Sequence, residues 1–118
     1  MNKITRLVTN SRRGRAVIYN GIVFLGGQVA DDRGQDICGQ TEQVLSKIDS
    51  FLAKCGSDKS RLLSAQIWLY DIDRDFAGMN QVWDAWVDQE NVPSRATCQA
   101  YMGAANVLIE VIVTAAVD

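Results

Sequence analysis

One carboxylate lies inside a segment that otherwise has the composition of a buried β-strand. Glu110 is flanked on both sides by β-branched and apolar residues across positions 106–117, as is typical of a strand covered on both faces. An ionised carboxylate that leaves water loses much of its solvation free energy unless another group pairs with it. Glu110 is therefore a candidate for ion pairing, ligand binding or proton transfer.

Arg95 is the candidate partner of this carboxylate. If the last two predicted strands, 95–101 and 107–117, form a hairpin, the guanidinium and the carboxylate of Glu110 can lie close together. One interpretation is a structural ion pair between neighbouring strands. The other is functional: the arginine binds a planar carboxylate with its fork of donors, and the glutamate holds or deprotonates a water molecule.

Other common catalytic groups are missing from the sequence. The chain has no histidine, which excludes Ser-His-Asp and Cys-His catalysis and most transition-metal sites. Its three cysteines, Cys38, Cys55 and Cys98, form no C-x-x-C pair, so we expect reduced thiols, a cytoplasmic location, and neither a disulfide framework nor a zinc site. Cys98 lies near the Arg95–Glu110 pair but has no neighbouring base, and we expect it to be a small buried hydrophobic residue. We expect the other two cysteines to serve packing.

Length and charge indicate one domain that does not bind nucleic acid. The 118 residues are close to the commonest domain size, and we expect one domain over 1–118. The net charge is −2 and the pI is about 5.0, whereas nucleic-acid binders are normally basic. The basic cluster at 12–15 predicts a solvated or ligand-facing loop. We find no signal-peptide core and no apolar run of membrane-spanning length, and expect no membrane association.

Apolar alternation and β-branched runs predict six strands. Their expected ranges are 4–8, 16–20, 22–29, 61–71, 95–101 and 107–117. Asn20-Gly21 predicts a type I′ hairpin turn, because both central positions of that turn need positive φ. Gly26-Gly27, late in the third strand, predicts a bulge or the close approach of another backbone or a ligand. The two glycines lack the context of a nucleotide-binding motif.

Two amphipathic helices separate the later strands. The first is expected over 37–55, with Asp36 or a neighbouring residue as N-cap and Gly56 just after its end. The second is expected to begin at Asp73 or Asp75 and to end before the single proline. Its apolar stripe, which we expect to join the core, contains Phe76, Met79, Trp83, Trp86 and Val87. Asn80 lies off the densest part of this stripe and is free to point at a pocket.

The element order β-β-β-α-β-α-β-β predicts an α+β fold. It fits a single mixed sheet of about six strands with two helices packed on one face. The strand over 107–117 is apolar on both faces, so the second face of the sheet must also be hidden. Self-association is the expected way to cover it.

The chain resembles the Rid family, the YjgF-type reactive-intermediate deaminases, over almost its whole length. The resemblance rests on 20–28, 66–71, Asn80, and Pro93-Ser94-Arg95 followed by Ile109-Glu110-Val111. It implies a chorismate-mutase-like fold and a homotrimer with three ligand sites in clefts between subunits. It also implies cofactor-independent hydrolysis of enamines and imines, such as 2-aminoacrylate, to 2-oxo acids and ammonia.

The resemblance also implies roles for individual residues. Arg95 would bind the substrate carboxylate and Glu110 would position the attacking water. The backbone at Thr97 would line the site where many relatives carry a cysteine, which here follows one place later as Cys98. Asn80 would contribute from the second helix.

The rim of this site departs from the family pattern. Gly26, which with Gly27 is expected to line the substrate site, stands where well-known deaminase members carry a serine. Arg13 stands about where they carry a tyrosine. These departures leave open a first alternative to imine hydrolysis, a non-catalytic binder of small carboxylate metabolites in the same cleft. A second alternative is a ribonuclease, an activity sometimes attached to this family. The acidic pI and the lack of an aromatic-basic surface argue against the ribonuclease.

Overall fold

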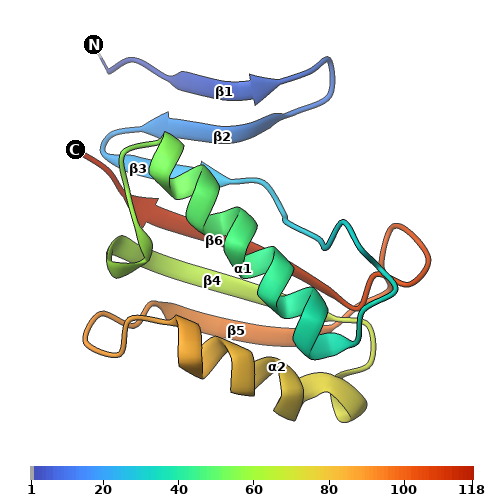
Figure 1. Ribbon diagram of the computed structural model, residues 1–118. Helices are drawn as coiled ribbons and strands as arrows, with labels where there is room; N and C mark the ends of the chain where they lie inside the picture. Colours follow the sequence, from blue (N-terminus) through green and yellow to red (C-terminus); the bar gives the residue numbers. More distant parts are fainter. Residues whose placement is uncertain (1) are drawn as a thin grey trace.

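The structure, a computed structural model, describes residues 2–118 and contains one six-stranded sheet with two helices on one of its faces (Figure 1). The elements in chain order are β1 (Thr5–Thr9), β2 (Gly14–Tyr19), β3 (Ile22–Leu25), α1 (Ile37–Lys54), the 3-10 helix η1 (Lys59–Arg61), β4 (Leu62–Leu69), α2 (Ile72–Trp86), β5 (Ser94–Gln99) and β6 (Ile109–Ala116). The strand order is β1-β2-β3-β6-β4-β5. Only β4 and β5 pair in parallel. The predicted α+β fold is confirmed.

The third strand is shorter than predicted because its two glycines interrupt the ladder. Asn20 and Gly21 have φ of 52° and 75°, which confirms the expected turn between β2 and β3. β3 ends at Leu25 instead of continuing to position 29. Gln28 then rejoins the sheet through an isolated bridge to Val111 of β6. This stretch therefore has the predicted bulge-like irregularity rather than regular strand.

Both helices begin at an aspartate, but the second begins earlier than predicted. Asp36 caps α1 by accepting a hydrogen bond from the backbone N–H of Gly39 at 2.9 Å. Asp71, not Asp73 or Asp75, caps α2. The other two aspartates lie in the first turn, where the helix dipole favours negative charge. The chain turns into α2 directly after β4, so the first available aspartate takes the cap.

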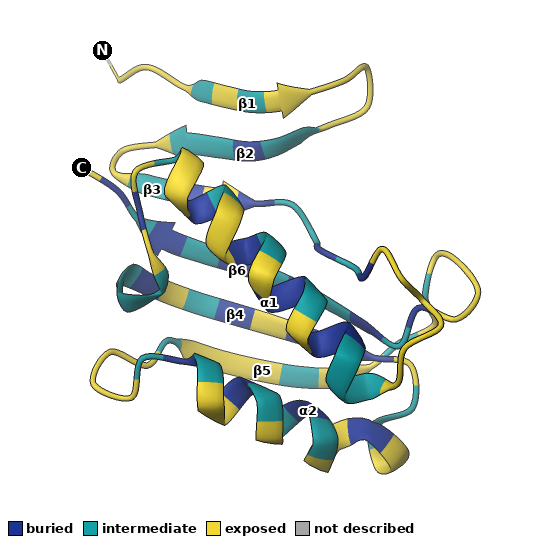
Figure 2. Ribbon diagram, in the orientation of Figure 1, coloured by how far each residue is buried: buried dark blue, intermediate teal, exposed yellow. Residues whose placement is uncertain are grey.

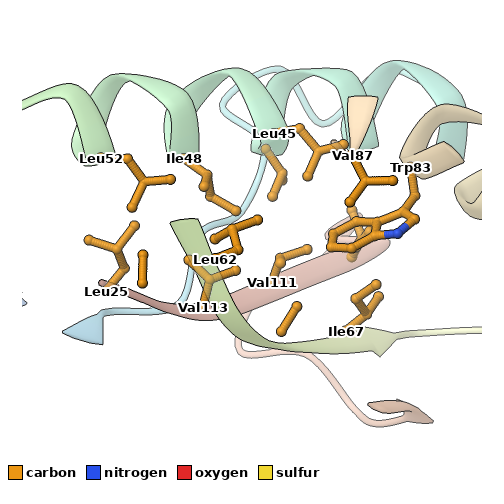
Figure 3. Packing of buried hydrophobic residues seen from close by; sticks show 14 of the residues in the cluster. Leu25, Leu45, Ile48, Leu52, Leu62, Ile67, Trp83, Val87, Val111 and Val113 are labelled. Atoms are coloured by element: carbon orange, nitrogen blue, oxygen red, sulfur yellow. The ribbon is translucent and has the colours of Figure 1, made fainter. Parts of the chain in front are cut away.

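The core lies between the sheet and the two helices (Figures 2 and 3). The buried side of the sheet carries alternate residues of each central strand, such as Ile67 of β4 and Val111 of β6, and Ile48 of α1 packs toward them. Trp83 of α2 is 5% exposed and closes this core beside β5. Phe76 is 41% exposed, so its predicted place in the buried stripe was wrong.

The opposite face of the sheet has no helix over it. Phe24 is 46% exposed there, and Trp68 and Ile112 are half-buried on the same face. Cys98, aligned with Trp68 on the edge strand β5, is exposed. The prediction that Cys98 is buried was therefore wrong, because this face is uncovered within one chain. The apolar second face expected from the sequence is present and faces outward.

Candidate functional site

Arg95 and Glu110 do not meet within one chain. β4 lies between β5 and β6, so these two strands form no hairpin. Arg95 is in register with Ala65, a core residue, and therefore lies on the helix-covered face. Glu110 is in register with Trp68 and lies on the open face. Both the predicted proximity and the structural ion pair were wrong, because β5 returns parallel to β4 after the α2 crossover.

The side chain of Arg95 is held in place by α2. Its Nη1 donates a 2.8 Å hydrogen bond to Oδ1 of Asn80, and its Cζ lies 5.5 Å from the ring centroid of Trp83. This stacking is a cation–π contact. Arg95 itself is exposed, and within residues 2–118 it forms no ion pair. Its remaining N–H donors are therefore available to a planar anion.

Thr97 lies on the same face as Arg95, two residues further along β5. Its hydroxyl is buried and has no hydrogen-bond partner among the described residues. The structure thus groups three predicted site residues, Arg95, Thr97 and Asn80, and adds Trp83. Sequence reasoning assigned Trp83 to the core alone. The sequence contains one signal for a role of Trp83 at the site: Trp83 follows Asn80 by three residues, which places the two side chains on one side of α2.

Glu110 occupies space that a side chain at position 27 would need. A Cβ added to Gly27 would lie 2.0 Å from Oε2 of Glu110 and 2.9 Å from its Cδ. Within the described residues this carboxylate has no hydrogen bond to a side chain and no ion pair. The predicted close approach at the glycine pair is thus made by Glu110, and with its carboxylate in this position there is no room for a Cβ at position 27.

Gly26 has no such steric reason. A Cβ there would meet its nearest atoms, backbone oxygens of Gly14 and Arg15, only at 3.7 Å, which is ordinary contact. The N–H of Gly26 donates to the carbonyl of Arg15 at 2.9 Å, so β2 runs directly beside it. Arg13 precedes β2 and is exposed. The predicted residues Arg13, Gly26, Gly27 and Glu110 therefore lie in one region, which we call the Glu110 half-site.

The Arg95 half-site, which contains Arg95, Asn80, Thr97 and Trp83, lies on the other face of the sheet. Neither half lines a largely apolar groove of about 500 Å³ between α1 and α2 beside Trp86. That groove has no arginine among its lining residues.

Across the described residues no three His, Cys, Asp or Glu side chains gather as metal ligands. Neither helix within residues 2–118 is both long enough and apolar enough to cross a bilayer.

Sequence comparisons place this arrangement among known proteins. The profile of the family described as Endoribonuclease L-PSP matches residues 4–117. A RutC family protein of Haemophilus ducreyi is 43% identical over 115 residues, which cover 98% of this chain and 97% of that protein. The RutC family protein YoaB of Escherichia coli is 39% identical over 114 residues, covering 97% and 98%.

Solved structures give the same result. NMB1025 of Neisseria meningitidis, described as a member of the YjgF protein family, is 40% identical with a TM-score of 0.94. The match covers 98% of this chain and 96% of that one. YyfA of Yersinia pestis, described as a protein of unknown function of the conserved Rid family, is 27% identical with a TM-score of 0.82 and coverage of 92% and 90%.

Proposed function

Because the chain belongs to the YjgF/RutC family, also called the Rid family, we propose that it hydrolyses reactive imines of small 2-oxo acids. The observation that carries this proposal is that neither Arg95 nor Glu110 forms an ion pair within the described residues. Asn80 and Trp83 hold the guanidinium in place, and the carboxylate of Glu110 lies against Gly27. A cation and a carboxylate that are both unpaired can divide substrate binding and water activation between them.

The chemistry needs no group beyond water and these side chains. The guanidinium of Arg95 binds the substrate carboxylate, and Glu110 accepts a proton from a water molecule that adds to the imine carbon. The proton passes to the imine nitrogen, which gives a carbinolamine. Glu110 then takes the hydroxyl proton of the carbinolamine and passes it to the nitrogen. The C–N bond breaks, ammonia leaves, and the carbon becomes the carbonyl of a 2-oxo acid. A positioned carboxylate can serve as base and then as acid in these steps.

A complete site requires two copies of the chain. The two half-sites differ and lie on opposite faces of the sheet, so a head-to-tail interface can join the Arg95 half-site of one copy to the Glu110 half-site of the next. Head-to-tail interfaces generate rings when the rotation closes. We propose a ring of three, as the family resemblance implies, which would also cover the open face that exposes Phe24.

Mixing two inactive variants tests the proposal. Arg95→Ala and Glu110→Gln are each expected to lose nearly all release of ammonia from freshly generated 2-aminoacrylate. When the two variants are unfolded and refolded together, random rings contain intact sites in about a quarter of their clefts, and activity returns to about that level. Arg33→Ala, a change at an exposed arginine of the 31–36 loop, is the control and retains activity.

Each outcome of this mixing experiment is informative. Full activity in the single variant Arg95→Ala would contradict the proposal. Loss in both variants without recovery on mixing would place both residues in one chain and contradict the shared site.

A second candidate is a non-catalytic carboxylate binder. The open space at Gly26, where a side chain would fit, favours it, because the site then lacks one polar group at its rim. Binding of 2-oxobutyrate without turnover of any imine would support this candidate. Cleavage of RNA that is lost in Arg95→Ala would instead support the endoribonuclease activity named in the family description.

A further inference from the structure

The charges of this chain are divided very unevenly between two parts of the sheet. Residues 2–30 contain five basic residues and no acidic residue, whereas residues 31–118 contain seven basic and fourteen acidic residues. The first part is β1, β2, β3 and their turns, which form one edge of the sheet in Figure 1. An acidic protein thus has one strongly basic edge, and that edge adjoins the Glu110 half-site.

One of these arginines lies on the same face as Glu110, and a second comes shortly before it in the chain. Ala16 faces the core, so alternation along β2 directs Arg15 to the opposite, open face. Arg13 is exposed in the turn that leads into β2. Arg15 lies beside Gly26 across the β2–β3 pair, because the N–H of Gly26 donates a hydrogen bond to the carbonyl of Arg15. Glu110 lies on the open face as well, against the neighbouring Gly27.

The hairpin that presents these arginines is ordered by hydrogen bonds of the side chain and the backbone of Asn10. Oδ1 of Asn10 accepts hydrogen bonds from the N–H groups of Arg12 and Arg13 at 2.8 and 2.9 Å, and the N–H of Asn10 donates to the carbonyl of Arg13 at 2.8 Å. The side chains of Arg12, Arg13 and Arg15 form no ion pair within the described residues. Their charge is therefore not neutralised by the chain itself.

Asp31, an acid whose pKa is influenced by Arg15, already has a partner. Asp31 is bonded to Lys47 at 2.8 Å, and that hydrogen bond is the main reason that its pKa is lowered, with Arg15 contributing a smaller effect through its charge. The charge of Arg15 thus lowers the pKa of Asp31 without a direct ion pair between the two side chains.

From this arrangement we infer that Arg13 and Arg15 bind a second acidic group of the substrate, so that the site prefers imines of 2-oxo dicarboxylic acids. Arg95 can bind only the carboxylate next to the imine carbon. A second carboxylate would be repelled by Glu110 unless cations lay beside it. Arg15 on the open face and Arg13 in the turn before β2 supply them. The inference rests on the proposed function for the location of the site.

The test compares the two classes of imine on one set of variants. Imines are generated from glutamate and from 2-aminobutyrate with amino-acid oxidases, and kcat/KM for their hydrolysis is measured for wild type and for the double variant Arg13→Gln/Arg15→Gln. We expect wild type to favour the dicarboxylate by about tenfold or more, as for a charge-assisted contact, and the double variant to lose that ratio. Arg13→Lys/Arg15→Lys, which keeps both charges, should retain most of it.

Arg6→Gln is the matched control. Arg6 belongs to the same basic edge and lies opposite Val17, one strand further from the Glu110 half-site than β2. Arg6→Gln removes one charge from β1 and should keep the wild-type ratio of kcat/KM for the dicarboxylate imine over the monocarboxylate imine. A wild-type enzyme without preference, or a preference unchanged in the double glutamine variant, would overturn the inference while leaving imine hydrolysis intact.

Binding separates this inference from a failure of the proposed function. If wild type hydrolyses neither imine, the affinities for 2-oxoglutarate and 2-oxobutyrate are compared by calorimetry at fixed ionic strength, since exposed charges are screened by salt. Tighter binding of the dicarboxylate that is lost in Arg13→Gln/Arg15→Gln supports the anion site without catalysis. Equal affinities overturn it.

Discussion

Adding one methyl group at position 27 should strongly impair the proposed imine hydrolysis, whereas the same change at position 26 should not. The Cβ of Gly27→Ala would lie 2.0 Å from Oε2 of Glu110, and the Cβ of Gly26→Ala would find nothing closer than 3.7 Å. Neither glycine has positive φ, so backbone strain does not separate the two variants. They differ only in what the new methyl meets.

The size of the effect follows from that distance. A carbon–oxygen contact settles at about 3.3 Å or more, so the carboxylate of Glu110 must retreat by roughly 1.3 Å. Misplacement of a catalytic group by about 1 Å can cost on the order of 100-fold in rate, which corresponds to about 2.7 kcal/mol. The fold should survive, because the obstacle is the far end of a flexible side chain.

The assay is ammonia release from 2-aminoacrylate, with urea unfolding of the same samples. We expect Gly27→Ala to lose about 100-fold in kcat, Gly26→Ala to stay within a few-fold of wild type, and both to unfold within about 1 kcal/mol of it. Equal activity of the two variants would refute the reasoning, because it would mean that the position of Glu110 against Gly27 is not the one used in catalysis.

Three further predictions concern the other half-site and the stability of the fold. Asn80→Ala removes the acceptor of the 2.8 Å hydrogen bond from Arg95 and should raise KM about tenfold with a smaller change in kcat; an unchanged KM in steady-state assays would contradict this. Gly78→Ala would place a Cβ 2.8 Å from a methyl of α1 and should lower the free energy of unfolding by about 1–3 kcal/mol in urea titrations, and a more stable variant would show that the helices can separate. The hydrogen bond from Lys47 lowers the pKa of Asp31 below its usual 3.8, so its stabilisation is present above about pH 4 and is lost as pH falls through the lowered pKa. Asp31→Asn should therefore flatten the dependence of urea midpoints on pH below 4, and an unchanged slope would contradict it.

The sequence was sufficient for the architecture because local patterns determined each element. The turn at Asn20-Gly21 and the N-cap at Asp36 each follow from one residue type at one position. The cap of α2 was wrong because three aspartates lie within five residues, and only the end of β4 decides that Asp71 is used. Propensity at one position does not contain that information.

The candidate site could be predicted as a set of residues but not as a geometry. Arg95 and Glu110 were expected on adjacent strands, since sequential strands usually pair, yet β4 separates β5 from β6. The exposure of Cys98 had the same cause, because the sequence indicates an apolar open face but not which cysteine faces it. Pairing between distant segments is decided by the whole sheet, and a pattern within one strand does not encode it.

The position of β6 in the sheet also has a consequence for how the protein is made. This strand is the last in the chain, yet it lies between β3 and β4 and bonds to both. A nascent chain that has not yet reached Ile109 contains the strands β1, β2 and β3, the parallel pair of β4 and β5, and both helices. It lacks β6, the strand that bonds β3 to β4. We therefore expect the sheet to be completed only after residues 109–116 have left the ribosome, and the strand that completes it is the one that carries Glu110. Protease resistance of ribosome-bound chains should rise sharply only after this segment emerges, and an earlier rise would show that the two pieces are stable without it.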